Sequence, residues 1–118
     1  MKKSLFLSAV LMTSYWVIPS TSYAYGDNVG LRICEYVQAN DKERLRAYLK
    51  KQKLKIRDIF DDIRCNDKNL LVFAAYNKSL EAGEFLIGKI PAKKVTNSYD
   101  EIVKYSAHLA ETAKNRSK

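Results

Sequence analysis

One histidine and a short acidic cluster are the side chains in this chain that come closest to a catalytic or metal-binding set. His108 is the single histidine among 118 residues. Its neighbours Ala107 and Leu109 are apolar, a setting typical of a side chain on a helix surface or at the edge of a core rather than of an acid–base catalyst. We therefore assign His108 no catalytic role.

Three carboxylates, Asp58, Asp61 and Asp62, would share one face of a helix and could hold a cation. Arg57 and Arg64 flank them, and solvated ion pairs are the simpler interpretation. The sequence also contains no glycine-rich phosphate loop, no nucleophile elbow and no His-Glu-x-x-His motif. We predict no catalytic, cofactor or metal site, and hence no enzyme.

A basic run is the feature most open to a functional interpretation. Its five candidate anion-binding residues are Lys50, Lys51, Lys53, Lys55 and Arg57. Such a positive patch attracts phosphate and carboxylate polymers with a strength that falls as salt rises. The alternative is a connector that only keeps the protein soluble. Arg44 and Arg46 extend the same surface if a helix precedes the run.

Tyrosines could mark a surface for a protein partner. Several of those beyond residue 24 fit core positions of helices, where the hydroxyl reaches the rim. Tyr36 and Tyr76 fall nearest the less buried sides of their helices, and they are our candidate interface residues.

Residues 1–24 have the layout of a signal peptide. Lys2 and Lys3 precede an apolar stretch over residues 5–18, and Ser22-Tyr23-Ala24 offers small residues for cleavage. A membrane anchor is the alternative, but the stretch is short for a span and no basic cluster follows it. We expect cleavage near Ala24, a periplasmic or secreted protein, and no transmembrane helix in the mature form.

Two cysteines, Cys34 and Cys65, are the only ones in the chain. An exported chain meets an oxidising compartment, so a disulfide is expected, with two buried thiols as the alternative. Closing that loop is worth about 3–4 kcal/mol in the chain-entropy model. A metal site is disfavoured because one histidine cannot complete a set of four ligands with two cysteines.

Apolar residues recur at helical spacing throughout the rest of the chain. After a short leader, 25–28, a single helical domain is expected over 29–113, followed by a frayed tail, 114–118. The first helix should end near Ala39. The second, 41–52, should be capped by Asn40.

The remaining elements follow from the same pattern. Residues 54–63 fit a helix, although the start of a short strand stays open, and 65–68 form a turn. Asn69 and Ser79 are expected to cap the next two helices, and Gly88 to close the second of them as a left-handed residue. A last helix should open at Ser98.

Residues 69–87 resemble the two-helix core of an ankyrin repeat. The residues in register are Leu71, Ala74, Ala75, Leu80, Glu81 and Leu86, while Leu70, Val72 and Lys78 replace the Pro, His and Gly of that pattern. A weaker copy, 33–49, lies 37 residues earlier, with Asn40 matched to Asn77. The resemblance implies an ankyrin-like arrangement of helix pairs.

A second resemblance covers most of the chain beyond residue 33. It is carried by Cys34-Glu35-Tyr36, Asn40-Asp41-Lys42, Leu54-Lys55-Ile56-Arg57, Cys65-Asn66 and the segment 70–74. These are similar to a family of small exported proteins of Gram-negative bacteria known only as a domain of unknown function. Asp67 stands where that family commonly has Gly after the Asn. The resemblance implies secretion and the disulfide, and no activity.

Together these patterns predict an all-α, ankyrin-like small bundle of short helix pairs with one disulfide. The expected role is that of a non-catalytic protein-interaction or accessory module. The alternative is an electrostatic binder of lipopolysaccharide, phospholipid or cell-wall polymer through residues 50–57. No cofactor and no nucleic-acid partner are expected.

Overall fold

The computed structural model describes residues 26–117, and their regular structure is helical, as predicted. The helices are α1 (Gly26–Gln38), α2 (Lys42–Lys51), α3 (Ile56–Ile59), the 3₁₀ helix η1 (Phe60–Asp62), α4 (Leu70–Tyr76), α5 (Leu80–Lys89), α6 (Ala92–Tyr105) and α7 (Ala107–Ser117). Within 26–117 no helix is both long and apolar enough to cross a bilayer. The signal peptide predicted over 1–24 lies outside the described residues.

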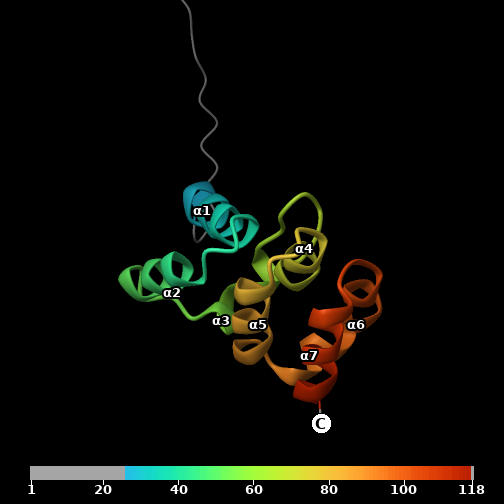
Figure 1. The fold of residues 1–118 in the computed structure, drawn as a ribbon. Helices are drawn as coiled ribbons and strands as arrows, with labels where there is room; N and C mark the ends of the chain where they lie inside the picture. The colour runs from blue at the N-terminus through green and yellow to red at the C-terminus, as the bar shows by residue number, and fades with distance from the viewer. Residues whose placement is uncertain (1–25, 118) are drawn as a thin grey trace, which may run out of the picture.

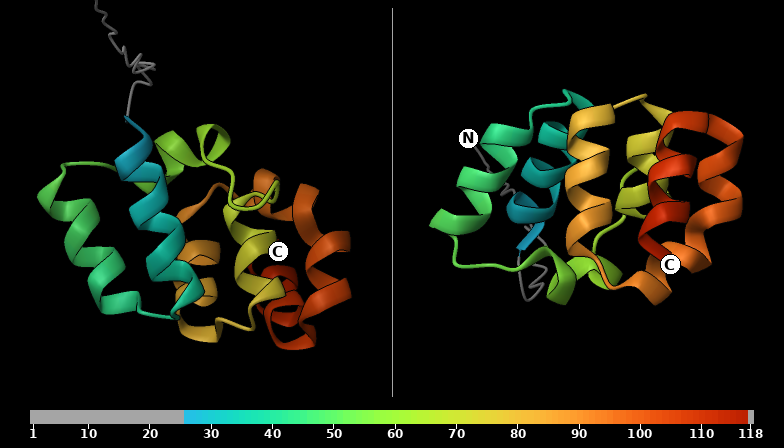
Figure 2. Two further views of the ribbon diagram at one scale, coloured as in Figure 1. Left: turned by 90° about the horizontal axis from the view of Figure 1, so that it is seen from above. Right: turned by 60° about the horizontal axis from the view of Figure 1, so that its bottom comes forward.

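Three helix pairs stack side by side in two layers (Figures 1 and 2). The first helices, α1, α4 and α6, contact one another in sequence order, and so do the second helices, α2, α5 and α7. Within each pair the two helices also pack together. The α3–η1 segment joins the first pair to the second and contacts α5. Helix pairs are therefore confirmed, while the ankyrin likeness stays a prediction.

One apolar core runs through all three pairs. Its fully buried side chains include Ile33, Leu45, Leu71, Leu86 and Ile102, which come from five different helices. These residues lie at the helical spacing that the sequence indicates. Burying such a side chain stabilises the fold by about 1.5–3 kcal/mol, so the core rather than helix propensity holds these short helices in place.

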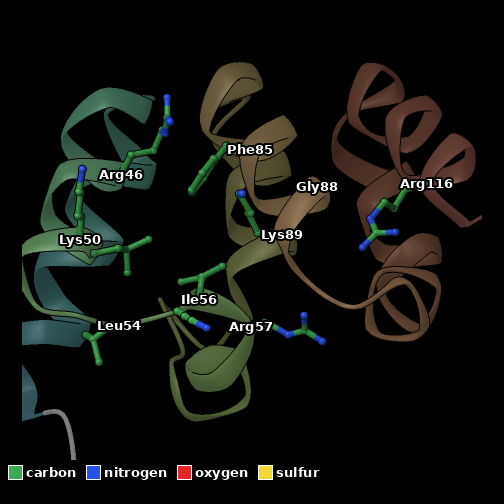
Figure 3. A pocket seen from close by; sticks show the side chains of 11 residues that line it. Arg46, Lys50, Leu54, Ile56, Arg57, Phe85, Gly88, Lys89 and Arg116 are labelled. Carbon is green, nitrogen blue, oxygen red and sulfur yellow. The ribbon is translucent and has the colours of Figure 1, made fainter.

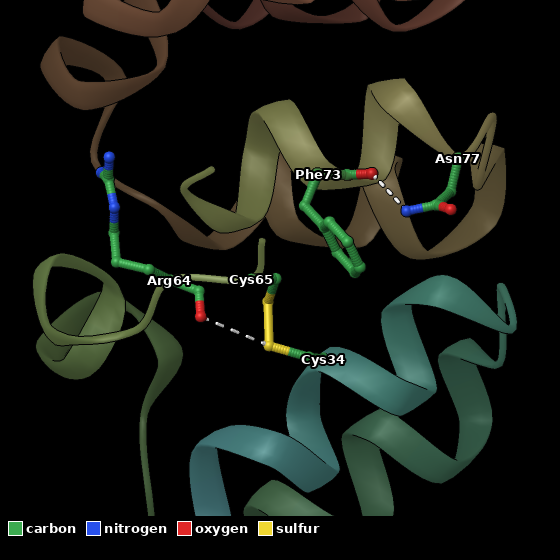
Figure 4. The surroundings of a disulfide bond; sticks show 5 residues. All are labelled: Cys34, Arg64, Cys65, Phe73 and Asn77. Atoms are coloured by element: carbon green, nitrogen blue, oxygen red, sulfur yellow. Dashed lines mark hydrogen bonds between the residues drawn. A yellow bond between two sulfur atoms is a disulfide. The ribbon is translucent and has the colours of Figure 1, made fainter. Parts of the chain in front are cut away.

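The disulfide joins the first helix to the connector. Cys34 of α1 and Cys65, which follows η1, are bonded with their Cα atoms 5.8 Å apart (Figure 4). The Cys34 sulfur lies 3.8 Å from the carbonyl oxygen of Arg64. The predicted pairing is thus present, and it ties the segment carrying α3 to α1.

The turns inside the first two pairs have the same backbone geometry. Asn40 and Lys78 both have positive φ, 56° and 57°. Each turn is closed by the pair of hydrogen bonds typical of a left-handed helix end, such as Asp41 N–H to the Tyr36 carbonyl and Ser79 N–H to the Ala74 carbonyl. Asn40 therefore corresponds to Lys78, the residue at the glycine position of the ankyrin pattern, and not to Asn77.

Two predicted helix caps differ from the structure. Asp41, not Asn40, caps α2, since its side chain accepts from the Arg44 N–H. Ser79 stands at the start of α5, but its hydroxyl makes no capping bond and is buried without a partner. The Asn40 side chain instead accepts from the Ala82 N–H of α5 at 2.9 Å. Asn69 caps α4 as predicted.

Several predicted boundaries shift. Residues 26–28, expected as a leader, form the first turn of α1, and α7 continues through the expected tail to Ser117. Gly88 lies inside α5 rather than closing it. The last helix does not open at Ser98, which is buried within α6. Residues 54–63 contain α3 and η1, so the strand alternative is wrong there.

Candidate functional site

A groove of about 540 Å³ opens where α2, α3, α5 and α7 face one another (Figure 3). We call it the cationic groove. Its lining residues are Arg46, Leu49, Lys50, Leu54, Lys55, Ile56, Arg57, Phe85, Gly88, Lys89 and Arg116. The groove thus lies on the layer of second helices and draws on all three helix pairs.

Helical spacing brings the lining residues to the opening. On α2, Arg46, Leu49 and Lys50 are three and four residues apart, which places them on one helix face. Phe85, Gly88 and Lys89 repeat the same spacing on α5. Each face therefore presents apolar groups and cations together.

The floor of the groove is apolar. Leu49 and Ile56 are almost fully buried, at 6% and 3% exposure, while Leu54 and Phe85 are half-buried and pack against the core. Gly88 contributes no side chain. A Cβ added there would meet nothing within 4 Å, so open space lies above this part of the floor.

The rim is cationic. Six of the lining residues are Lys or Arg and none is acidic. Among the described residues the ion pairs are Arg32–Glu35, Arg44–Asp41, Lys94–Asp61 and His108–Glu84, so no lining cation is paired. Like charges that line one opening without a compensating acid create a positive potential that concentrates anions there.

Arg116 is held in a fixed place by the backbone. Its Nε donates to the Ile87 carbonyl at 3.1 Å, and Nη2 donates to the Ile90 carbonyl at 3.2 Å. These carbonyls belong to the C-terminal end of α5, where a cation is favourable. The guanidinium therefore keeps α7 against α5 and sets one edge of the groove (Figure 3).

Three of the five predicted anion-binding residues, Lys50, Lys55 and Arg57, line the groove. Lys51 and Lys53 do not. Arg46 joins them, as the extension of the basic surface along α2 suggested. Sequence reasoning missed Lys89 and Arg116, because both come from distant segments that reach the groove only through helix stacking.

The predicted interface tyrosines are separate from this groove and from each other. Tyr36 is half-buried, with its ring edge against Tyr48. Tyr76 is 51% exposed; its ring packs edge-on against Tyr105, and Lys68 Nζ lies 4.5 Å from its centroid. Tyr76 is thus the more accessible of the two.

The acidic cluster is not a metal site among the described residues, where no group of three or more His, Cys, Asp or Glu side chains could hold an ion. Asp61 pairs with Lys94 at 2.6 Å rather than with Arg57 or Arg64. Arg64 donates instead to the Asp67 carbonyl. His108 pairs with Glu84 on the surface of α5 and α7.

Fold and site define the class: a small all-α protein of stacked helix pairs, tied by one disulfide and bearing a cationic groove. The chain belongs to the DUF3718 family, described as proteins of unknown function, whose family model matches residues 33–98. All groove residues except Arg116 lie in that range. Membership of an uncharacterised family is thereby confirmed, while export and a Gram-negative origin stay predictions. No curated protein and no solved structure matches the chain.

Proposed function

We propose that this protein is a non-catalytic binding module that holds anionic groups in the cationic groove. The observation that carries the proposal is the rim, where six cations line one opening and none has an acidic partner among the described residues. The acids nearest in sequence to the rim cations, Glu43, Asp58, Glu84 and Glu111, do not line the groove. A bound anion would relieve the mutual repulsion of these cations, which gives binding a direct electrostatic driving force.

The anions we propose are those of a bacterial envelope. The signal-peptide pattern of residues 1–24 supports export to the periplasm, where lipopolysaccharide, phospholipid head groups and cell-wall polymers carry phosphate and carboxylate. The full sequence has a formal net charge of +8, and the chain remains clearly basic without Lys2 and Lys3, which favours association with such surfaces.

Co-sedimentation with anionic vesicles and with lipopolysaccharide tests this function. Replacing Lys50, Lys55 and Arg57 by Gln should remove most of the binding. The matched control replaces Lys51, Lys53 and Lys104 by Gln, which removes the same charge from exposed positions outside the groove. Equal losses in both triple variants, or no loss in either, would refute a groove-specific role.

A protein-interaction role is the second candidate, and the exposed Tyr76 supports it. An exposed aromatic ring supported by Tyr105 and Lys68 resembles the anchors that dominate protein interfaces. A photo-crosslinking residue at position 76 should capture a discrete partner in cells, whereas one at Tyr36 should not. Identical crosslinking patterns at the two positions would contradict the assignment.

A further inference from the structure

The floor of the cationic groove is more apolar than binding of a hydrophilic polyanion requires. Leu49, Leu54, Ile56 and Phe85 line the groove together with the cations. We propose that the groove takes a single-chain anionic amphiphile: an unbranched alkyl chain on the floor, with its phosphate or carboxylate head on the rim. This inference rests on the proposed function and names the ligand class of the same site.

Gly88 leaves room in the groove for the alkyl chain of the ligand. Of the two glycines of α5, Gly83 is closely packed, since an added Cβ would lie 2.6 Å from Leu109 Cδ1. At Gly88 an added Cβ would meet no atom within 4 Å. The open position is thus the one in the groove, and it extends the apolar floor along α5. The groove volume of about 540 Å³ lies within the range of about 300–1,000 Å³ typical of small-ligand sites.

The head group has a prepared place as well. Arg116 is fixed by its two carbonyl bonds, so little side-chain freedom is lost when it meets an anion. Lys89, one residue after Gly88, brings a second cation beside the floor. An amphiphile contacts the cationic rim with its anionic head and the apolar floor with its alkyl chain. A polysaccharide leaves the apolar floor without a matching group.

Isothermal titration calorimetry on the purified exported protein can separate the two contributions. The probes are dodecyl phosphate below its critical micelle concentration, inorganic phosphate, and dodecyl maltoside as a neutral amphiphile with the same tail. We expect dodecyl phosphate to bind about tenfold or more tightly than either of the others, because it alone engages both surfaces. Dodecanoate is a fourth probe, and comparing its affinity with that of dodecyl phosphate shows whether the rim prefers a carboxylate or a phosphate head.

Gly88→Gln is the decisive variant, because it fills the space above the floor without changing the charge. It should weaken dodecyl phosphate binding about tenfold. Gly30→Gln is the matched control, since Gly30 lies in α1 and also has nothing within 4 Å of an added Cβ. The control should bind dodecyl phosphate like the original chain, and far-UV circular dichroism should show equal helicity for both variants.

The outcomes separate this inference from the proposal on which it rests. If phosphate and dodecyl phosphate bind equally well, the amphiphile inference is overturned and anion binding stands. If neither probe binds and the protein does not co-sediment with anionic vesicles or lipopolysaccharide either, both fail. Equal weakening by Gly88→Gln and Gly30→Gln, or binding to vesicles without binding to monomeric dodecyl phosphate, would also overturn the single-chain ligand.

Discussion

At the scale of the residue, several non-glycine positions carry backbone geometry that glycine adopts more easily. Asn40, Lys53, Asn66, Asp67 and Lys78 all have positive φ. In the turn 65–68, two consecutive residues do so, and Cys65 and Lys68 exchange both backbone hydrogen bonds. That geometry favours an Asn-Gly pair. The turn was predictable from its residue types, but the left-handed conformation of Asp67 was not.

Replacing Asp67 by Gly should therefore stabilise the protein. The Arg64 side chain donates to the carbonyl of residue 67, a bond that the substitution keeps. We expect the free energy of unfolding to rise by about 0.5–1 kcal/mol in urea titrations with the disulfide intact. Asp58→Gly, in helix α3, should lower it instead. A decrease for Asp67→Gly would show that the side chain stabilises the turn.

Asn40 stabilises a helix to which it does not belong. Its side-chain oxygen accepts from Ala82 N–H, 42 residues away, where Ala82 is fully buried. Asn40→Gly keeps the left-handed backbone but leaves that amide unpaired, which should cost about 1–3 kcal/mol of unfolding free energy. Asn40→Asp keeps the acceptor and should cost less. Equal losses in urea titrations would mean that the bond contributes nothing. The sequence marked Asn40 as a cap, but only the stacking of the pairs decides which helix it caps.

At the scale of the element, the two glycines of α5 have opposite roles. Gly83→Ala would force Leu109, itself buried, away from α5, and should lower the free energy of unfolding by about 1–3 kcal/mol. Gly88→Ala meets open space inside the helix and should raise it by about 0.5–1 kcal/mol. Thermal melts of the two variants test this contrast, and a stabilised Gly83→Ala would contradict the close α5–α7 contact.

Helices were easier to predict than their ends. The apolar periodicity identified the helical segments up to α5, since core burial follows the same spacing, but it merged α6 and α7 into one helix beginning at Ser98. The same apolar spacing continues through Ser106, but the chain becomes extended there. The Ser106 hydroxyl accepts from Leu109 N–H, and α7 begins. Ser98 was predicted to begin a helix, yet it lies inside α6, where its hydroxyl oxygen accepts a hydrogen bond from the Asn69 side-chain amide. Local capping signals are ambiguous because a buried serine can serve a partner in another helix.

At the scale of the whole molecule, the cationic groove is a product of stacking. The basic run supplied Lys50, Lys55 and Arg57 because these residues are close in sequence. Lys89 and Arg116 come from α5 and α7, and only the layer of second helices brings them to the same opening. The composition predicted a basic protein, but the concentration of its unpaired charge around an apolar floor required the tertiary arrangement.

The disulfide should contribute both to the stability of the molecule and to ligand binding in the groove. Four of the six rim cations, Arg46, Lys50, Lys55 and Arg57, lie in the loop that Cys34 and Cys65 close.

Replacing both cysteines by Ser frees that loop in the unfolded chain. It should lower the free energy of unfolding by about 3–4 kcal/mol, measured by urea titration. Dodecyl phosphate affinity should fall as well, since the connector that carries Lys55 and Arg57 loses its covalent tie to α1. Reduction of the original chain by dithiothreitol should reproduce both effects, while the Gly30→Gln variant in its oxidised form should show neither loss. A double-serine variant that stays folded with unchanged affinity would show that core packing alone positions the rim.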